Sequence, residues 1–293
     1  MQSRPVAYAM VILSMLIWGT LALFVKNVGY SSAEIVLVRI VFGLAFLLAA
    51  YLLTKKKSGA AAIRRNLPRM LISGAFMGFN WICLFEAYRW VDVSIATLCY
   101  YMAPVFVMLG SLLFFRQKLN AARCIGMAAA LAGVMITTGA VMGGIDPTRG
   151  VLFALASAVL YASVTLLVKS VKGLSGLEIT IGQLVGALVV ILPYVLLSHE
   201  GAWRLPTALE LGSMATLGLV HTGIALFFYF SAIQALPVQS TALLSYIDPL
   251  SALAFAAIFL GDRMTGIQWL GAALILGGAL VGELLGSRQH KAN

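Results

Sequence analysis

Tyr100-Tyr101-Met102-Ala103-Pro104 and Ser245-Tyr246-Ile247-Asp248-Pro249 interrupt two long apolar runs, one in each half of the chain. A proline inside a helix removes one backbone donor and frees the carbonyl four residues earlier, here those of Tyr100 and Ser245. Within a bilayer, such irregular backbone is tolerated where it faces a cavity. Two breaks at matching places in the two halves therefore predict a central binding site, with Pro104 and Pro249 as hinges.

The composition is that of a protein that crosses a membrane several times. Hydrophobic residues make up 61% of the 293 residues, and charged residues only 10%, which no soluble domain matches. The formal net charge of +10 does not indicate a nucleic-acid partner, because the basic residues lie in short connectors between apolar runs. There they act as topology signals. The expected surroundings are therefore a lipid bilayer.

The apolar runs have the length of spanning helices, which need about 20 residues. The sequence predicts an all-α polytopic membrane protein with ten spans, near 8–25, 33–53, 68–88, 93–115, 121–141, 149–168, 178–197, 207–231, 238–260 and 266–286. With the N-terminus inside, fourteen Lys and Arg residues fall on the inner side and five on the outer side, with Arg39 left within a span. Since basic residues favour the cytoplasmic side, both termini are expected in the cytoplasm.

An internal repeat relates the two halves. Small gaps align Ser14, Val25 and Lys26 with Ser157, Val168 and Lys169, and Glu34-Ile35 with Glu178-Ile179. A shift of 145 positions aligns Val93, Leu98, Tyr101, Pro104, Phe114, Gly126 and Gly133 with Val238, Leu243, Tyr246, Pro249, Phe259, Gly271 and Gly278. Each repeat, 1–141 and 142–293, holds five expected spans, so the second must run inverted through the membrane. That is the plan of a secondary transporter.

The residues also resemble a known family. Each copy has a proline-bearing helix, a short turn and a glycine-rich last helix: Tyr101-Met102-Ala103-Pro104 with Gly126 to Gly133, and Tyr246-Ile247-Asp248-Pro249, Leu260-Gly261-Asp262-Arg263 and Gln268-Trp269-Leu270-Gly271 with Gly277-Gly278. This pattern resembles the EamA-like branch of the drug/metabolite transporter superfamily over nearly the whole chain. The first copy departs at Phe115-Arg116-Gln117-Lys118, where an acidic residue usually follows a glycine. The resemblance implies ten helices, a cavity between the halves and export of amino acids or related metabolites.

Asp248 is the leading candidate for substrate binding. It lies about ten residues into its expected span, which places it near the middle of the bilayer. An ionisable group at that depth is a functional hypothesis, because burying it unpaired costs at least ~2.5–3.5 kcal/mol. The carboxylate would hold a substrate ammonium, or bind and release a proton that couples transport to the proton gradient. The structural alternative is an aspartate hydrogen-bonded to the backbone of the helix break.

Other polar residues within or near the spans have two interpretations each. His221 is either packed and hydrogen-bonded or, if it faces the cavity, suited to proton sensing. Arg39, about a turn and a half from Glu34, is expected to form a structural clamp, with binding of a substrate carboxylate as the alternative. Glu86 and Arg89, at the outer end of their span, form either a gate pair or an interfacial pair.

Aromatic residues gather near the expected cavity. They are expected to contact an apolar or aromatic part of the substrate, with hydroxyl groups and Asn80 supplying polar contacts. Tyr101 and Tyr246 occupy equivalent positions of the repeat, and both are expected inside the cavity. The full set of candidate substrate-binding residues is Asp248, Tyr101, Tyr246, Tyr100, Ser245, Asn80, Trp81, Phe79, Trp18, His221 and Phe228.

Several classes of function are excluded by missing motifs. The chain has no nucleotide-binding loop and no nucleophile–base constellation, so neither an ATP-driven pump nor an enzyme is expected. Cys83, Cys99 and Cys124 lack metal-ligand spacing, and no cofactor is predicted. The spacings Gly74-x-x-x-Gly78, Gly182-x-x-x-Gly186 and Gly278-x-x-x-Gly282 predict close helix packing within a monomer, with weak homodimerisation as the alternative.

The sequence therefore predicts an exporter in the inner membrane of a bacterium. Its small-molecule substrate would be an amino acid or a derivative, moved by alternating access around a mid-membrane cavity, with the proton as a candidate coupling ion. The alternative is an exporter of cationic drugs or quaternary amines that uses Asp248 as the counter-charge.

Overall fold

The computed structural model describes residues 3–53, 58–90, 96, 99–115, 121–138, 148–199, 204–259 and 266–292. Throughout these ranges the secondary structure is helical. The elements are α1 (Arg4–Gly19), α2 (Leu21–Val25), α3 (Ser32–Leu53), α4 (Ala60–Trp90), α6 (Ala103–Phe115), α7 (Ala121–Thr138), α8 (Thr148–Ser170), α9 (Gly176–Ser198), α10 (Ala208–Thr216), the π-helix η2 (Leu217–Ile224), α11 (Ala225–Ala235), α12 (Val238–Leu244), α13 (Ile247–Phe259) and α14 (Gly266–Ala292). The expected boundary between 141 and 142 lies outside the described residues.

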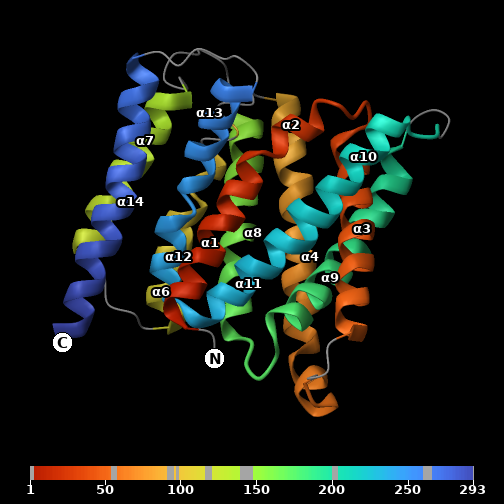
Figure 1. The fold of residues 1–293 in the computed structure, drawn as a ribbon, viewed down its shortest axis with the longest axis horizontal. Coiled ribbons are helices and arrows are strands. Elements are labelled where there is room, and N and C mark those ends of the chain that lie inside the picture. The colour runs from red at the N-terminus through yellow and green to blue at the C-terminus, as the bar shows by residue number, and fades with distance from the viewer. Residues whose placement is uncertain are drawn as a thin grey trace.

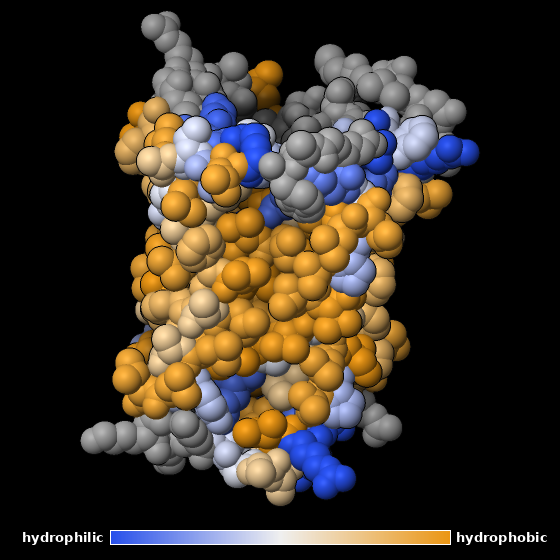
Figure 2. Space-filling model, turned by 90° about the vertical axis from the view of Figure 1, so that its right-hand side faces the viewer, coloured by the Kyte–Doolittle hydropathy of each residue, from blue (hydrophilic) through white to orange (hydrophobic). Residues whose placement is uncertain are grey.

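The chain is a multi-pass membrane protein. Within the described ranges, six helical segments are long and apolar enough to cross a membrane: Arg4–Val25, Ser32–Leu53, Ala60–Trp90, Arg149–Ser170, Gly176–Ser198 and Ala208–Ala235. The helices Ala103–Phe115, Ala121–Gly133 and Trp269–Gly278 are shorter apolar segments. Figure 2 shows a hydrophobic band across the middle of one side of the molecule, with hydrophilic residues at both ends.

Most helices run along one direction, while the segment from α10 to α11 crosses them obliquely, and the two ends of the chain lie at the same end of the molecule (Figure 1). We call that end the terminal face, and the end formed by residues 26–31 and 204–207 the opposite face. Helices α7 and α14 pair at one edge, while α3 packs on α9 and η2 at the other. Between these edges α4 packs on α8 and α9, and α1 packs on α11.

Local sequence signals account for several helix starts. A Ser or Thr that caps the first turn, followed three residues later by Glu, forms a capping box that satisfies free backbone N–H groups at the helix start. Ser175 and Glu178 form such a box at α9, and Thr207 and Glu210 form one at α10. Pro5 lies in the first turn of α1, where its missing N–H has no cost.

The two proline-associated breaks are present. Turn residues Tyr101 and Met102 precede α6, and turn residues Ser245 and Tyr246 separate α12 from α13. The Ser245 carbonyl, freed by Pro249, accepts a hydrogen bond from the N–H of Asp248 at 3.2 Å. The break therefore keeps this carbonyl paired, which a bilayer interior requires.

The glycine spacings serve packing within the chain. A side chain at Gly74 would meet the backbone of Gln183 and Gly186 on α9. One at Gly278 would meet the backbone of Gly126 and Ala130 on α7. Since only glycine permits these approaches, the close helix pairs predicted from the spacings are confirmed.

Candidate substrate cavity

A cavity of about 490 Å³ lies among helices from both halves of the chain. Its polar and aromatic lining comes from helices α1, α3, α4, α8 and η2, from the breaks before α6 and α13, and from the first turn of α13. These lining residues are Trp18, Ser32, Arg39, Asn80, Trp81, Phe85, Tyr88, Tyr100, Tyr101, Tyr161, His221, Ser245 and Asp248. Pro104 also lines it. Ser32 begins α3 and Tyr88 lies near the end of α4, so the cavity extends towards the opposite face.

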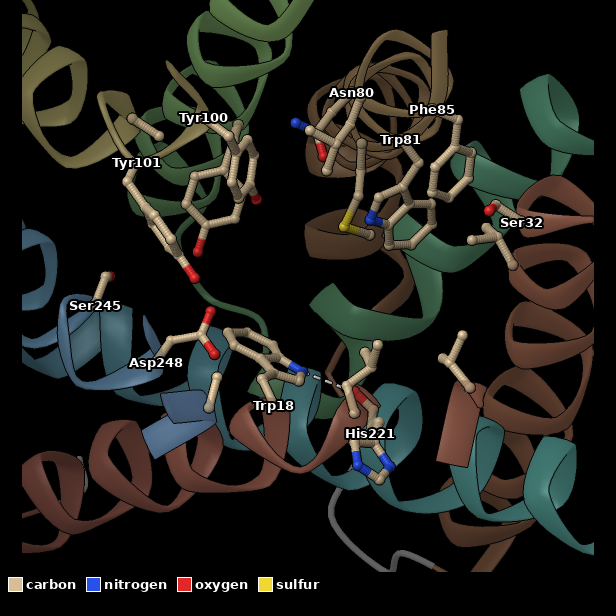
Figure 3. Close-up of a pocket in the computed structure, with 18 of the residues that line it drawn as sticks. Trp18, Ser32, Asn80, Trp81, Phe85, Tyr100, Tyr101, His221, Ser245 and Asp248 are labelled. Atoms are coloured by element: carbon tan, nitrogen blue, oxygen red, sulfur yellow. Dashed lines mark hydrogen bonds between the residues drawn. The ribbon is translucent and has the colours of Figure 1, made fainter. Parts of the chain in front are cut away.

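Asp248 is the second residue of α13 and lines this cavity. In Figure 3 its carboxylate points into the space between Tyr101 and Trp18. Its backbone is held by the break, since its N–H donates to Ser245 and its carbonyl accepts from the Ser251 hydroxyl at 2.9 Å. Among the described residues the carboxylate itself has no ion-pair partner. A negative charge at a helix N-terminus is stabilised by the helix dipole, so this position suits a carboxylate that awaits a cationic partner.

A chain of aromatic rings lies beside Asp248. Tyr100 is 6.0 Å from Tyr101 and 5.8 Å from Tyr161, measured between ring centroids. Tyr161 stacks on Tyr229 at 6.4 Å, and Trp18 meets Tyr229 edge-on at 5.3 Å. Rings at these separations support one another. Four of them, Trp18, Tyr100, Tyr101 and Tyr161, line the cavity, and aromatic rings attract cations.

The sequence-based prediction missed Tyr161, although the repeat contained the signal. The alignment of Ser14 with Ser157 places Tyr161 at the position of Trp18. In the structure both residues line the cavity. Equivalent positions in the two halves therefore line the same cavity.

Arg39 also lines the cavity, and its Nε donates to the Thr222 hydroxyl at 3.1 Å. The expected clamp with Glu34 is not formed. Glu34 instead accepts hydrogen bonds from the backbone and hydroxyl of Ser31 and contacts Nδ1 of His199 at 2.9 Å. The only partner of the guanidinium among the described residues is thus a neutral hydroxyl.

His221 lies in η2 and is buried, although it contributes to the cavity wall. Its Nε2 contacts the Thr20 hydroxyl at 2.9 Å, and its Nδ1 contacts the Thr216 carbonyl at 3.4 Å. Its own carbonyl accepts from Trp18 at 2.8 Å, as Figure 3 shows. Both ring nitrogens therefore have protein partners, which fits the packed and hydrogen-bonded interpretation.

Asn80 is buried at the cavity wall and joins two helices. Its amide nitrogen donates to the carbonyl and to the hydroxyl of Ser157, each at 2.7 Å. With the amide nitrogen engaged by α8, the amide oxygen is the group left to act as an acceptor at the cavity wall.

Three expected substrate-binding residues lie elsewhere. Tyr246 is fully buried with 0% exposure, and its hydroxyl reaches the Tyr101 carbonyl instead of the cavity. Phe79 is 49% exposed on the outer surface of α4. Phe228 packs against the hydrophobic core. Position within a span could not assign the helix face on which each of these residues lies.

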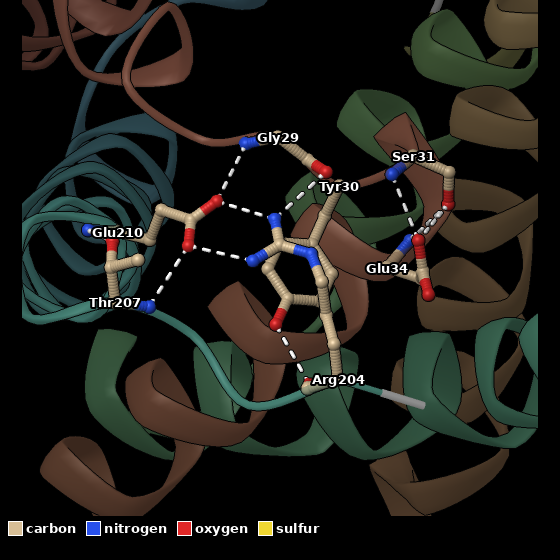
Figure 4. A network of polar contacts seen from close by, with 7 residues as sticks. All are labelled: Gly29, Tyr30, Ser31, Glu34, Arg204, Thr207 and Glu210. Atoms are coloured by element: carbon tan, nitrogen blue, oxygen red, sulfur yellow. Dashed lines mark hydrogen bonds and ion pairs between the residues drawn. The ribbon is translucent and has the colours of Figure 1, made fainter. Parts of the chain in front are cut away.

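Two polar networks lie at the opposite face, outside the cavity. Glu86 pairs with Arg89 at 3.1 Å and accepts from the Tyr194 hydroxyl of α9 at 3.2 Å. In the other network, drawn in Figure 4, Arg204 donates to Glu210 and to the carbonyl of Gly29, and thus ties the α2–α3 loop to α10. The hydrogen bond to Glu210 raises the pKa of Arg204, so this link stays ionised.

The profile of the EamA-like transporter family matches this chain twice, over residues 5–139 and 148–282. The chain belongs to the EamA-like transporter family. It is therefore a transporter and not an enzyme, and it acts on a small molecule within a membrane.

Named relatives span most of the chain. The uncharacterized transporter YxxF of Bacillus subtilis is 28% identical over 100% of this chain and 93% of its own. A riboflavin transporter of Rhizobium johnstonii is 32% identical over 82% of this chain and 77% of its own length. A probable amino-acid metabolite efflux pump of Salmonella typhimurium is 27% identical over 92% of this chain and 92% of its own length. A protein of known crystal structure superposes with a TM-score of 0.87 at 23% identity, covering 98% of this chain and 99% of the other. That likeness concerns the fold alone.

Proposed function

We propose that this transporter exports a small metabolite that carries an ammonium group, an amino acid or a derivative, across the inner membrane of a bacterium. The observation that carries the proposal is the Asp248 carboxylate, which faces the cavity without an ion-pair partner among the described residues. A substrate ammonium would supply the missing positive charge. The amino-acid metabolite efflux pump among the relatives supports the same class of substrate.

We propose that the chain forms ten spans in two inverted five-helix repeats, 1–141 and 142–293, with both termini in the cytoplasm. The two family matches and the paired helix breaks support this arrangement. The distribution of Lys and Arg supports the orientation. The terminal face is then cytoplasmic and the opposite face is extracytoplasmic. The glycines that pack helix on helix within one chain support a monomer as the transporting unit.

Transport would occur by alternating access, with Pro104 and Pro249 as hinges. The cavity extends towards Ser32 and Tyr88, while contacts between the halves close the terminal face. There Ser58 donates to Glu178 twice, at 2.9 and 2.6 Å, and Asn66 donates to the Lys172 carbonyl at 2.9 Å. These contacts support our assignment of the described conformation as outward-facing. Because Asp248 faces the cavity, it is also the group we assign to proton coupling.

An exporter of cationic drugs or quaternary amines is the second candidate. The aromatic chain beside Asp248 favours it, since rings around a carboxylate suit organic cations. Arg39 in the same cavity favours the first candidate, because a second positive charge would repel a substrate that is only cationic.

A thermal-shift screen tests the proposal. The detergent-purified protein would be heated with amino acids, amines, riboflavin and lipophilic cations, beside Asp248→Asn and the control Glu86→Gln, whose carboxylate lies outside the cavity. A ligand that binds only the folded protein raises the melting temperature with concentration. We expect amino acids or their derivatives to stabilise the wild type and Glu86→Gln but not Asp248→Asn. Stabilisation by riboflavin or lipophilic cations alone would contradict the proposal.

A further inference from the structure

Arg39 shares the cavity with Asp248 without forming an ion pair with it. A guanidinium has five N–H donors, and Arg39 uses only the one on Nε, towards the Thr222 hydroxyl. No hydrogen bond from its two terminal amino groups to the described residues is present. Arg39 is half-buried, and neither amino group is among the fully enclosed atoms that lack a partner. The planar fork that suits a carboxylate is therefore open.

The other carboxylates whose side chains the structure describes are engaged elsewhere. Glu34 is held by Ser31 and His199, and Glu86 by Arg89 and Tyr194. Glu178 accepts from Ser58 and Ser175 at the terminal face, and Glu210 accepts from Arg204 at the opposite face. A half-buried guanidinium without a counter-charge is unfavourable inside a membrane. An anion supplied by a ligand would remove that cost.

Arg39 is oriented into the cavity by both of the elements that hold it. Ser32, Ile35, Val36 and Arg39 recur at helical spacing on one face of α3, and all four line the cavity. On the other side, the π-helix η2 presents Thr222, whose hydroxyl donates to the Leu217 carbonyl five residues earlier at 3.0 Å. That bond aims the oxygen lone pairs at Nε of Arg39. Short π-helical segments often occur at functional sites.

The repeat indicates that packing does not require these two charges. The offset that aligns Glu34 with Glu178 places Gln183 at the position of Arg39, and the offset of the proline breaks places Ala103 at the position of Asp248. Gln183 is buried and donates to Ser73. The same fold positions thus accept a neutral amide and a methyl group in the other half. Each pair thus carries one charged member, and both charged members, Arg39 and Asp248, line the cavity.

We propose that Arg39 binds the carboxylate of the transported molecule while Asp248 binds its ammonium, so that the site selects zwitterions over the corresponding amides and amines. Thr222 is a positioning residue: it holds Nε so that the two terminal amino groups face the substrate. This inference rests on the proposed function, since it requires that an amino compound occupies the cavity.

Matched ligands test the assignment. Phenylalanine and leucine would each be compared with the amide and with the decarboxylated amine, using the affinity for the purified protein and the rate of exchange in liposomes. Loss of one charge-assisted contact lowers affinity by about tenfold or more. We therefore expect the wild type to bind the acid at least about tenfold more tightly than the amide.

Variants separate this role from a structural one. In Arg39→Gln the ratio of acid to amide affinity is expected to fall towards one while the affinity for the amide persists. Thr222→Val keeps the side-chain shape without the hydroxyl, and we expect it to lower the same ratio partly. Arg89→Gln, which removes an exposed cation from the opposite face, serves as the control and should leave the ratio unchanged.

The outcomes are distinguishable. If none of the amino compounds binds the wild type, the proposed function is wrong and this inference falls with it. If the acid and the amide bind equally well, or if Arg39→Gln keeps the wild-type ratio, only the inference about Arg39 is overturned. If Arg39→Gln does not fold, Thr222→Val and the wild type decide. An unchanged ratio of acid to amide affinity in Thr222→Val, together with equal binding of acid and amide by the wild type, would then overturn the inference about Arg39.

Discussion

The hydroxyl of Tyr246 donates a hydrogen bond to the carbonyl of Tyr101 at 3.4 Å. The two tyrosines occupy equivalent positions of the repeat, so this bond joins the two helix breaks directly. Tyr246 is only two residues from Asp248 in the sequence, but it is fully buried and does not line the cavity. The break that presents Asp248 is thereby fixed to the break that presents Tyr101.

Tyr246→Phe tests this connection. The bond is long, so we expect the variant to lose about 0.5–1.5 kcal/mol of stability, the usual net contribution of a single hydrogen bond. The ligand affinity should change by less than about threefold, because the tyrosine ring does not line the cavity. Thermal melting measures the change in stability, and ligand titration measures the change in affinity. A large loss of affinity with unchanged stability would place Tyr246 in the site after all.

A pair of neighbouring glycines on α14 provides a test of the helix pairing. A methyl group at Gly278 would meet the backbone of Gly126 and Ala130, whereas one at Gly277 would meet nothing within 4 Å. Gly278→Ala should therefore cost about 1–3 kcal/mol, as overpacking does. Gly277→Ala should be neutral or stabilising by up to about 1 kcal/mol, because alanine favours a helix. Equal melting temperatures for the two variants would contradict the described α7–α14 contact.

Arg123 joins the halves near the terminal face. It is buried on α7, and it donates to the Gln239 side chain at 2.8 Å and to the Ser240 hydroxyl at 3.3 Å on α12. In the proposed cycle this contact must break before the cavity opens to the cytoplasm. We expect Arg123→Gln to raise the population that is open on the terminal face.

A double-mutant cycle of Arg123→Gln with Gln239→Ala measures the strength of this contact. Residues in direct hydrogen-bonding contact usually show a coupling energy of about 0.5–3 kcal/mol. Labelling of a cysteine placed at the position of Ala103, which lines the cavity, would report access from the terminal face. Additive effects on stability and unchanged labelling would remove Arg123 from the closure of that face.

Much of the fold followed from the sequence because a bilayer imposes simple rules. Apolar length predicted the long helices, and Pro104 and Pro249 predicted the breaks, since a proline within a span must free a carbonyl. The π-helix η2 was not predicted. Its cause is tertiary, because Gly218 and Gly223 lie against Phe42 and Phe46 of α3, and no local pattern records that contact.

The candidate site was predicted in part. Depth in the span identified Asp248, and seven other expected binding residues also line the cavity: Trp18, Asn80, Trp81, Tyr100, Tyr101, His221 and Ser245. Helix rotation decided the rest, which is why Tyr246 is buried and Phe79 faces outward. Arg39 was predicted with the wrong partner, since its proximity to Glu34 in sequence said nothing about His199 or Thr222.

Counterflow in proteoliposomes tests the central claim most directly. Vesicles loaded with an unlabelled amino acid, identified in the thermal-shift screen, would take up the same labelled compound through the wild type, Asp248→Asn or Glu86→Gln. We predict that Asp248→Asn lowers uptake by about tenfold or more, because a charged contact of about 1.5–3 kcal/mol is lost, while Glu86→Gln stays near the wild-type rate. Uptake by Asp248→Asn at the wild-type rate would contradict the claim that Asp248 holds the substrate.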